Sequence, residues 1–221
     1  MEDLVDVYAA PFWAPEGWTA ARRCLVSCLL RRYEAESPLL DIGCGSGYQW
    51  PGYEVRGVDA DSCAVARARG KGLKVIKAAA DALPFAAGEF RTVLLLDVLE
   101  HMEDDLQALQ EAHRVLAEGG LAIISVPLYQ SLWSTHDERV GHLRRYRPGR
   151  VDSLLNRAGF NVLYRTRWNL PGLPGAFLRK MGLDINSAVD RFGPLMKLEA
   201  RLAARFPLPL GLSGFWVGGK P

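Results

Sequence analysis

The glycine-rich segment at residues 39–47 constrains the fold of this chain more than any other part of its sequence. It is LLDIGCGSG, a short apolar run that is followed by Gly43, Gly45 and Gly47. A short apolar run that stops at glycine is typical of a strand buried on both faces of a parallel sheet. Glycines adopt positive φ angles easily and leave no Cβ between the backbone and a ligand. The segment therefore predicts a buried strand and a loop that holds a small molecule.

The spacing of the glycines and the next acidic residue narrow the identity of that molecule. A dinucleotide fingerprint, G-x-G-x-x-G, would need its third glycine at position 48, where the chain has Tyr48. A second strand is predicted at residues 55–59 and ends in Asp59. The Asp59 carboxylate can accept hydrogen bonds from two neighbouring ribose hydroxyls. These features favour a ligand with a free ribose diol over one with a 2′-phosphate.

Further segments follow in an order that resembles the class I S-adenosylmethionine-dependent methyltransferases. The segments that carry the resemblance are LLDIGCGSG at 39–47, ADALPF at 80–85 after a strand predicted at 73–77, DVLEH at 97–101 after a strand predicted at 90–96, RVL at 114–116, the glycine pair at 119–120, strands predicted at 121–126 and 160–168, and a last strand at 215–217. The resemblance implies an α/β fold of the Rossmann-like, doubly wound type. The expected sheet has seven mostly parallel strands and helices on both faces.

The same resemblance implies S-adenosyl-L-methionine as the cofactor. In the family, an aspartate of the segment like ADALPF meets the adenine amino group, and the segment like DVLEH lines the methionine end. One departure is that only 18 positions separate Asp41 from Asp59, with Pro51 between them, so the helix that the family has there is at most about one turn long. The expected cofactor-binding residues are Asp41, Gly43, Cys44, Gly45, Gly47, Asp59, Ala60, Asp81, Ala82, Leu83, Asp97, Val98 and His101.

Length and composition favour a single domain over residues 1–221, because a chain of this length can bury roughly 70% of its unfolded surface in one core. The resemblance implies that this is a methyltransferase domain. The apolar spacing of Trp18, Ala21 and Leu25 predicts a helix that covers one edge of the sheet. The expected parts are an N-terminal helical cover at 1–36, a cofactor-binding core at 37–126, and an acceptor side at 127–221 with a loop, the last strands and a helical insertion at about 169–210.

The pattern of cysteines and apolar runs favours a cytoplasmic protein. Cys24, Cys28, Cys44 and Cys63 form no C-x-x-C pair, so neither a disulfide framework nor a zinc site is predicted. No signal peptide is expected, and no run of about 18 apolar residues predicts a transmembrane helix. Peripheral contact with a membrane stays open as an alternative.

Charge is distributed unevenly along the chain. Residues 1–140 carry 13 Lys and Arg against 21 Asp and Glu, a net charge of −8, whereas residues 141–221 carry 14 against 4, a net charge of +10. Such asymmetry favours an anionic partner for the C-terminal third. The alternative is that these basic side chains form a solvated face.

The segment WSTHDERVGHLRRY at 133–146 contains the candidate catalytic residues His136, Asp137 and His142. It follows the fifth predicted strand and is similar to a segment of family members that act on small molecules. Either histidine can take a proton from the acceptor, and the alternative is that these side chains only bind one another. Their spacing matches no standard zinc pattern, so no metal is expected.

The insertion near the C-terminus contains a helix predicted to begin at Pro194. Its apolar stripe is Leu195, Leu198, Leu202 and Phe206, and its basic row is Lys197, Arg201 and Arg205. We expect this helix to cover the sheet or the acceptor pocket. The alternative is that it lies on an anionic membrane surface.

The resemblance and these patterns predict S-adenosylmethionine-dependent methyl transfer to a small or lipid-like, anionic acceptor. Two other functions are considered. A nucleic-acid methyltransferase would use the basic third on phosphates, but the chain has DVLE at 97–100 where enzymes that methylate base amines have D/N-P-P-Y/F. Nucleic acid is therefore not the expected partner. The second alternative is a non-catalytic member that only binds the cofactor.

Overall fold

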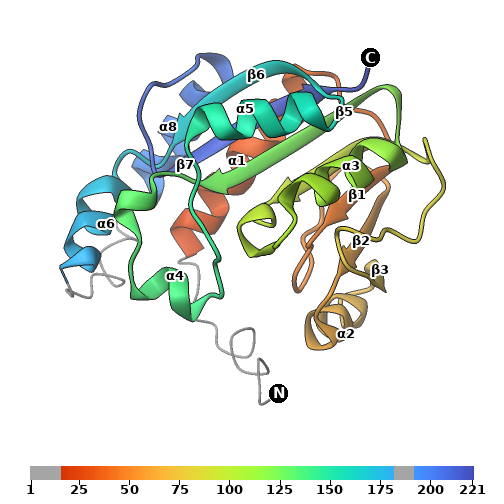
Figure 1. The fold of residues 1–221 in the computed structure, drawn as a ribbon, viewed down its shortest axis with the longest axis horizontal. Coiled ribbons are helices and arrows are strands. Elements are labelled where there is room, and N and C mark those ends of the chain that lie inside the picture. Colours follow the sequence, from red (N-terminus) through yellow and green to blue (C-terminus); the bar gives the residue numbers. More distant parts are fainter. Residues whose placement is uncertain (1–15, 182–191) are drawn as a thin grey trace.

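The computed structural model describes residues 16–181 and 192–221, and a seven-stranded sheet forms its centre (Figure 1). The strand order is β3-β2-β1-β4-β5-β7-β6. Strand β7 runs antiparallel to both of its neighbours, and the other neighbouring pairs are parallel. The predicted seven-stranded, mostly parallel sheet is therefore confirmed. The strands are β1 (Leu39–Ile42), β2 (Val55–Asp59), β3 (Lys74–Lys77), β4 (Phe90–Leu96), β5 (Leu116–Pro127), β6 (Asn161–Trp168) and β7 (Ser213–Gly219).

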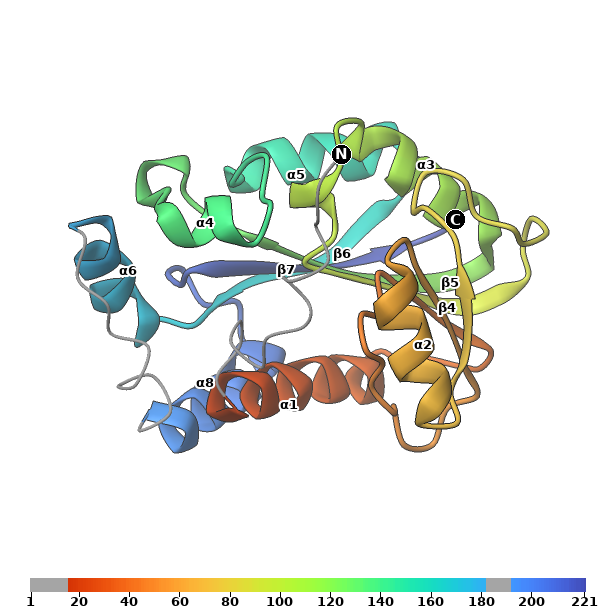
Figure 2. The ribbon, with the colours of Figure 1, turned by 90° about the horizontal axis from the view of Figure 1, so that it is seen from below.

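Helices cover both faces of the sheet, as predicted (Figure 2). Helices α1 and α8 lie side by side on one face, and α3 and α5 lie on the other. Helices α4 and α6 lie near the carboxyl end of β5 (Figure 1). The described helices are α1 (Glu16–Arg32), α2 (Ser62–Gly70), α3 (Asp105–Val115), α4 (Thr135–Arg139), α5 (Pro148–Arg157), α6 (Gly172–Lys180) and α8 (Gly193–Arg205), with the short 3-10 helices η2 (Leu99–His101) and η3 (Gln130–Leu132).

Alternate side chains of the central strands fill two apolar layers. Val93 and Leu95 of β4 pack in the layer beneath α3 and α5, whereas Leu94 and Leu96 pack in the layer that α1 and α8 cover. Successive side chains of a strand point to opposite faces, so one strand serves both layers. Burial on both faces explains why the central strands are nearly continuous apolar runs.

Helix α1 has the predicted apolar stripe, but it covers a face of the sheet and not an edge. Ala21 and Leu25 of α1 belong to the same buried cluster as Leu94 of β4 and Ile123 of β5. Because β4 and β5 are inner strands of the sheet, the helix lies across its middle. The stripe of a helix shows which side is buried, but not which strands it meets.

Helix α8 begins at Gly193, close to the predicted Pro194, but it turns the opposite face to the sheet. The predicted stripe is exposed, with Leu195, Leu198, Leu202 and Phe206 each accessible over about half of their surface at 51%, 54%, 46% and 54%. The buried side carries Met196, Ala200, Ala203 and Ala204. Alanines allow a close approach, and a Cβ at Gly193 would lie 3.1 Å from Gly17 Cα in α1. Close packing of the two helices therefore selects the smaller residues.

The connections match the sequence expectations with one exception. Residues 43–54 contain turns and no helix, as the short spacing between β1 and β2 requires. Strand β5 begins at Leu116 and not at the expected Leu121, because Leu116 already pairs with Phe90 before an irregularity in the ladder.

No helix in the described ranges 16–181 and 192–221 is long and apolar enough to cross a membrane.

Candidate functional site

A cavity of about 850 Å³ opens beyond the carboxyl ends of β1, β2 and β4. This position is where open parallel sheets bind their ligands, and the volume is in the usual range for small-molecule sites. Three groups of residues line it: the glycine loop and strand ends, the loop after β5, and an apolar wall from the segment after β6, α6 and α8. The cavity thus joins segments from nearly the whole length of the chain.

The glycine loop begins at the end of β1. Gly43, Gly45 and Gly47 have φ angles of +66°, +56° and +78°, in the left-handed region that favours glycine. Gly43 and Gly45 line the cavity, together with Cys44 between them. Gly47, which was expected to bind the cofactor, lies outside this lining, and a Cβ there would come within 2.2 Å of Leu73 Cδ1. The packing against Leu73 therefore favours glycine at position 47.

Asp59 fixes the glycine loop to the end of β2. The Gly45 amide donates to Asp59 Oδ2 at 2.7 Å, and the Asp61 amide donates to Oδ1 at 2.9 Å. Each carboxylate oxygen keeps a further lone pair that a ribose hydroxyl can use. Asp59 and Ala60 both line the cavity, in agreement with the expected ribose contact.

Asp41 lies at the base of the loop with almost no exposure, and it also lines the cavity. Its Oδ2 accepts a hydrogen bond from Trp50 Nε1 at 3.1 Å. Burial raises the pKa of Asp41 to about 6, although the hydrogen bond from Trp50 and the charge of Arg22 act to lower it. The protein therefore holds a carboxyl group here in surroundings that disfavour its charge.

Asp97 is held between β5 and α1. Its φ angle is +56°, its Oδ1 accepts a hydrogen bond from Ser125 Oγ at 3.0 Å, and Arg22 lies 3.1 Å from Oδ2. Arg22 also donates to the Leu96 carbonyl at 2.9 Å. Asp97, Arg22 and Val98 line the cavity. Sequence reasoning missed Arg22, and the signal that could have found it is a cation within the apolar stripe of α1.

The expected adenine contact at residues 81–83 is not in the described lining. Leu83 is buried in the core, its amide donates to Glu111 Oε2 at 2.8 Å, and its carbonyl accepts from Arg114. The segment reaches the cavity instead through Ala78 and Ala80. The contact of Asp81, Ala82 and Leu83 with the cofactor therefore stays a prediction.

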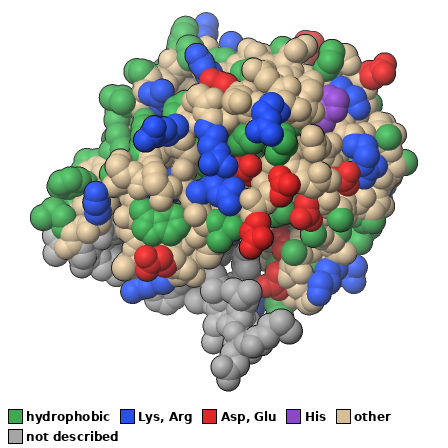
Figure 3. All heavy atoms as spheres, in the orientation of Figure 1, with side chains coloured by type: hydrophobic (Ala, Val, Ile, Leu, Met, Phe, Trp, Pro, Cys, Tyr) green, Lys and Arg blue, Asp and Glu red, His purple; other side chains and the backbone are tan. Residues whose placement is uncertain are grey.

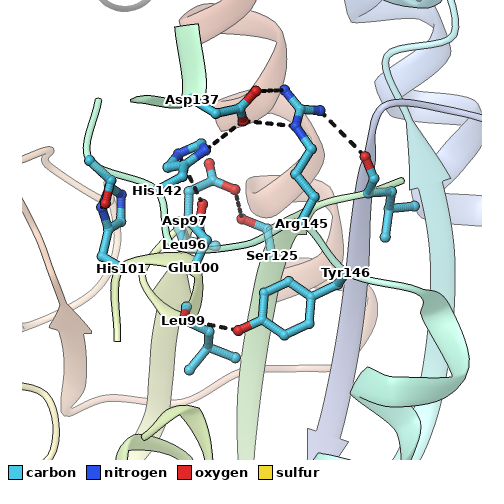
Figure 4. Close-up of polar contacts among 12 residues, drawn as sticks. Leu96, Asp97, Leu99, Glu100, His101, Ser125, Asp137, His142, Arg145 and Tyr146 are labelled. Atoms are coloured by element: carbon cyan, nitrogen blue, oxygen red, sulfur yellow. Dashed lines mark hydrogen bonds and ion pairs between the residues drawn. The ribbon is translucent and has the colours of Figure 1, made fainter. Parts of the chain in front are cut away.

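The loop after β5 is organised around Asp137, which is completely buried (Figure 4). Arg145 Nε and His142 Nδ1 lie 2.7 Å and 2.8 Å from Asp137 Oδ1, and the Ser134 amide donates to Oδ2. Burial acts to raise the pKa of Asp137, but the hydrogen bonds from His142 and Arg145 outweigh it and hold this pKa well below its ordinary value. His136, His142 and Arg145 line the cavity, whereas Asp137 lies behind them.

A second carboxylate stabilises the base of the same loop. Asp105 Oδ2 accepts hydrogen bonds from Arg144, Arg150 and Tyr146 Oη at distances of 2.8 to 3.2 Å. Tyr146 is fully buried, and its hydroxyl also lies 2.9 Å from the Leu99 carbonyl. Part of the positive charge of the C-terminal third therefore holds the loop to α3.

Glu100 and two histidines form a polar group in the cavity wall (Figure 4). Glu100 has no exposed surface, and neither of its oxygens has a hydrogen-bond partner among the described residues. Burial and the nearby charge of Asp97 raise the pKa of Glu100 well above its ordinary value. Glu100 Oε1 lies 3.8 Å from His142 Nε2, and the rings of His101 and His142 are in edge contact. Sequence reasoning did not single out Glu100.

The opposite wall is apolar, and part of it comes from α8, the helix that we expected to cover the sheet or the acceptor pocket. It is formed by Leu170, Pro174, Leu178, Leu195, Met196 and Leu212. Further hydrophobic side chains are exposed along α6, which forms the left edge of the molecule in Figure 3. The cavity therefore has a polar end at the glycine loop and an apolar end at α6 and α8.

Comparisons with known proteins show which proteins this chain is similar to. A family model described as a methyltransferase domain matches residues 40–124. A probable S-adenosylmethionine-dependent methyltransferase of Mycolicibacterium smegmatis is 29% identical over 69% of this chain and 63% of its own length. The ubiquinone biosynthesis O-methyltransferase of Ruegeria pomeroyi is 34% identical over 54% of this chain and 60% of its own length. The chain spans between about half and two thirds of the length of the curated relatives it matches.

Solved structures share the fold over nearly the whole chain. A putative methyltransferase of Haloferax volcanii, in complex with the Trm112 methyltransferase activator, has a TM-score of 0.66 and 20% identity, and the match covers 100% of this chain and 99% of that one. The [4+2]-cyclase SpnF has a TM-score of 0.65 and 21% identity, with 99% and 91% covered. Sequence similarity and the glycine loop, more than the fold, identify the family. The chain belongs to the class I S-adenosylmethionine-dependent methyltransferases.

Proposed function

We propose that this protein transfers the methyl group of S-adenosylmethionine to an oxygen of a small, lipid-like acceptor. The observation that carries the proposal is the form of the cavity, which connects the glycine loop to an apolar wall of α6 and α8 past the Glu100, His101 and His142 group. An acceptor with an apolar body and a hydroxyl group fits this order of surfaces. The name of one relative, an O-methyltransferase, supports an oxygen nucleophile.

In this proposal the chain binds, aligns and shields the reactants. When bound, S-adenosylmethionine supplies a methyl group that its sulfonium already activates. Gly43 and Gly45 have no side chain between the loop backbone and the cofactor, so the cofactor can lie close to the backbone. Asp59 binds the ribose hydroxyls of the cofactor. The apolar wall excludes water and holds the acceptor so that its oxygen faces the methyl group, which is the main contribution such a transfer needs.

We propose that the acceptor hydroxyl contacts His136 and His142 and gives its proton to one of them. These are the two proposed catalytic residues of the loop after β5. Asp137 does not line the cavity, and we regard it as a positioning residue. Because its carboxylate can only accept, His142 must carry its proton on Nδ1, and the lone pair then lies on Nε2. Nε2 is the nitrogen near Glu100, on the cavity wall. Asp137 thus fixes the tautomer of His142, in which the lone pair of Nε2 faces the acceptor.

We assign the anionic preference to the surface around α8 and not to the interior of the cavity. Among the described residues, the guanidinium groups that line the cavity are those of Arg22 and Arg145, and each is paired with an aspartate. On α8, the exposed leucines lie beside Lys197, Arg201 and Arg205, which are exposed as well. Apolar side chains flanked by cations match an anionic membrane surface. In this proposal α8 is a peripheral contact through which a lipid-like acceptor is collected.

A methyl-transfer assay with isotopically labelled S-adenosylmethionine tests the proposed reaction. Alkyl-substituted phenols of increasing chain length serve as acceptors, and we expect methyl ether and S-adenosylhomocysteine in equal amounts, with KM falling as the chain lengthens. His142→Gln should lower kcat about a hundredfold, the usual effect of losing a group that handles a proton, with little change in cofactor affinity. His113→Gln is the matched control, because His113 packs against Phe160 outside the described lining. Normal turnover by His142→Gln, or methylation of none of the phenols, would refute the proposal.

A further inference from the structure

The Glu100, His101 and His142 group has the composition of a metal site. One carboxylate oxygen and one nitrogen from each ring all lie within 4.8 Å of one another. A metal with bonds of about 2 Å holds its ligand atoms roughly 3 to 4 Å apart, so small side-chain movements would bring the three atoms to bonding distance. Glu100 and His101 come from η2 after β4, and His142 comes from the loop after α4. The group differs from His136, Asp137 and His142, for which the sequence spacing predicts no metal.

Glu100 is the member of the group whose burial is not explained by contacts with the surrounding protein. It is completely buried, and both of its oxygens are without a hydrogen-bond donor among the described residues. A buried acceptor without a donor is costly, and such groups call for an ion or ligand. A cation bound at Glu100 would satisfy its oxygens.

The two histidines are oriented as metal ligands are. His142 Nδ1 lies 2.8 Å from Asp137 Oδ1, and His101 Nδ1 lies 3.1 Å from the Gly141 carbonyl. Both partners can only accept, so each ring carries its proton on Nδ1 and has its lone pair on Nε2. An imidazole whose second nitrogen donates to a carboxylate or a backbone carbonyl is the usual arrangement around bound metals. Both rings therefore have their free lone pair on Nε2, and for His142 this atom lies 3.8 Å from Glu100 Oε1.

We propose that Glu100, His101 and His142 bind one divalent transition-metal ion of the Zn²⁺ type in the cavity wall. Two imidazoles and one carboxylate favour such an ion over Mg²⁺ or Ca²⁺, which prefer oxygen ligands. Three protein ligands leave a position for an exogenous ligand. Because all three residues line the cavity, that position faces the acceptor.

The catalytic role of this ion rests on the proposed function, whereas its binding does not. The acceptor hydroxyl would bind at the open position, where the ion lowers its pKa and its proton leaves to solvent. The resulting oxyanion attacks the methyl carbon, the new C–O bond forms as the S–CH₃ bond breaks, and methyl ether and S-adenosylhomocysteine are the products. In this arrangement the lone pair of His142 Nε2 binds the ion, so His142 acts on the acceptor through the ion and does not take the proton itself.

Metal binding can be measured without any acceptor. The full chain is stripped with EDTA, dialysed and titrated with Zn²⁺, Co²⁺ or Mg²⁺ by calorimetry, and the Co²⁺ complex is followed by its visible absorption. We expect one Zn²⁺ or Co²⁺ per chain and no heat with Mg²⁺ at the same concentration. Glu100→Gln, His101→Gln and His142→Gln should each weaken Zn²⁺ binding at least about tenfold, the usual range for altered metal shells, and change the Co²⁺ spectrum.

Two variants control for the loss of a buried carboxylate and of an imidazole elsewhere. Glu199 is a second buried carboxylate with an unpartnered oxygen, and His113 has an unpartnered Nε2. Glu199→Gln and His113→Gln should bind Zn²⁺ like the wild type, and thermal melts identify any variant that fails to fold. His101→Gln keeps the test valid should Glu100→Gln not fold. Less than one Zn²⁺ per chain, or equal binding by all five variants, would overturn the site. Methyl transfer that continues undiminished in EDTA would overturn the catalytic role of the ion and leave the proposed function standing. Zn²⁺ binding without any methylated product would leave the metal site standing and overturn the proposed function together with the catalytic role of the ion.

Discussion

The Asp41→Asn variant should be more stable than the wild type at neutral and alkaline pH. Burial raises the pKa of Asp41 to about 6 from an ordinary 3.8, against the opposing effects of Trp50 and Arg22. Because the folded-state pKa is the higher one, the wild type loses stability as pH rises through the window from 3.8 to about 6. A shift of about two units is worth roughly 3 kcal/mol at 1.36 kcal/mol per unit. Asparagine keeps an oxygen that accepts from Trp50 Nε1 and carries no charge.

Urea denaturation of the cofactor-free protein at pH 4 and pH 8 measures this effect. We expect the free energies of unfolding of wild type and Asp41→Asn to differ by less than about 1 kcal/mol at pH 4, and the variant to lead by roughly 3 kcal/mol at pH 8. The same variant should bind S-adenosylhomocysteine more weakly, because a charge kept at a cost to stability is typical of a functional site. A variant that is less stable at pH 8, or a gap that does not change with pH, would refute the assignment of a destabilising carboxylate at the end of β1.

Two further predictions concern the cofactor and the membrane. Asp59→Ala should weaken S-adenosylhomocysteine binding by about 1.5 to 3 kcal/mol in calorimetry, because it removes a charged hydrogen-bond acceptor. Asp61→Ala is the control, because it removes only the N-terminal cap of α2 and should leave the affinity nearly unchanged. Equal losses of affinity in the two variants would argue against a ribose contact. Replacing Lys197, Arg201 and Arg205 with Gln should reduce sedimentation with anionic vesicles but not with neutral ones, and the same replacement of the exposed Lys71, Lys74 and Lys77 should not. Wild-type protein that fails to sediment with anionic vesicles would contradict the role of α8.

The sequence was sufficient to predict the sheet and the glycine loop, because both are encoded by neighbouring residues. Apolar runs that stop at Gly43 or Asp59 mark strand ends, and parallel strands bring those ends to one edge. Gly47 and Leu83 are absent from the described lining of the cavity, so their contact with the cofactor stays a prediction. Their neighbours in the fold, Leu73 and Glu111, are distant in sequence and follow no local pattern.

The remaining parts of the site depend on packing that no local pattern records. Arg22 reaches Asp97 only because α1 crosses the middle of the sheet. The sequence singled out His136, Asp137 and His142 alike, but only the two histidines line the cavity, whereas Asp137 lies behind them and accepts a hydrogen bond from Arg145. On α8, the larger residues formed the clearer stripe, yet the alanines face the sheet, since the close approach of α1 decides which side fits.

The position of β7 has a consequence for the order in which the chain can assemble during synthesis. Strand β7 is synthesised after the other six strands, yet it lies between β5 and β6, and until it arrives β5 has an unpaired edge and β6 has no neighbour in the sheet. The layer formed by α1 and α8 also joins segments that are far apart in the sequence, so Leu94 and Ile123 stay without α8 until residue 205 has emerged. Unpaired edges and uncovered apolar faces are the features that lead nascent chains to aggregate. A ribosome-bound chain that stops before β7 should therefore depend on chaperones far more than the finished protein does.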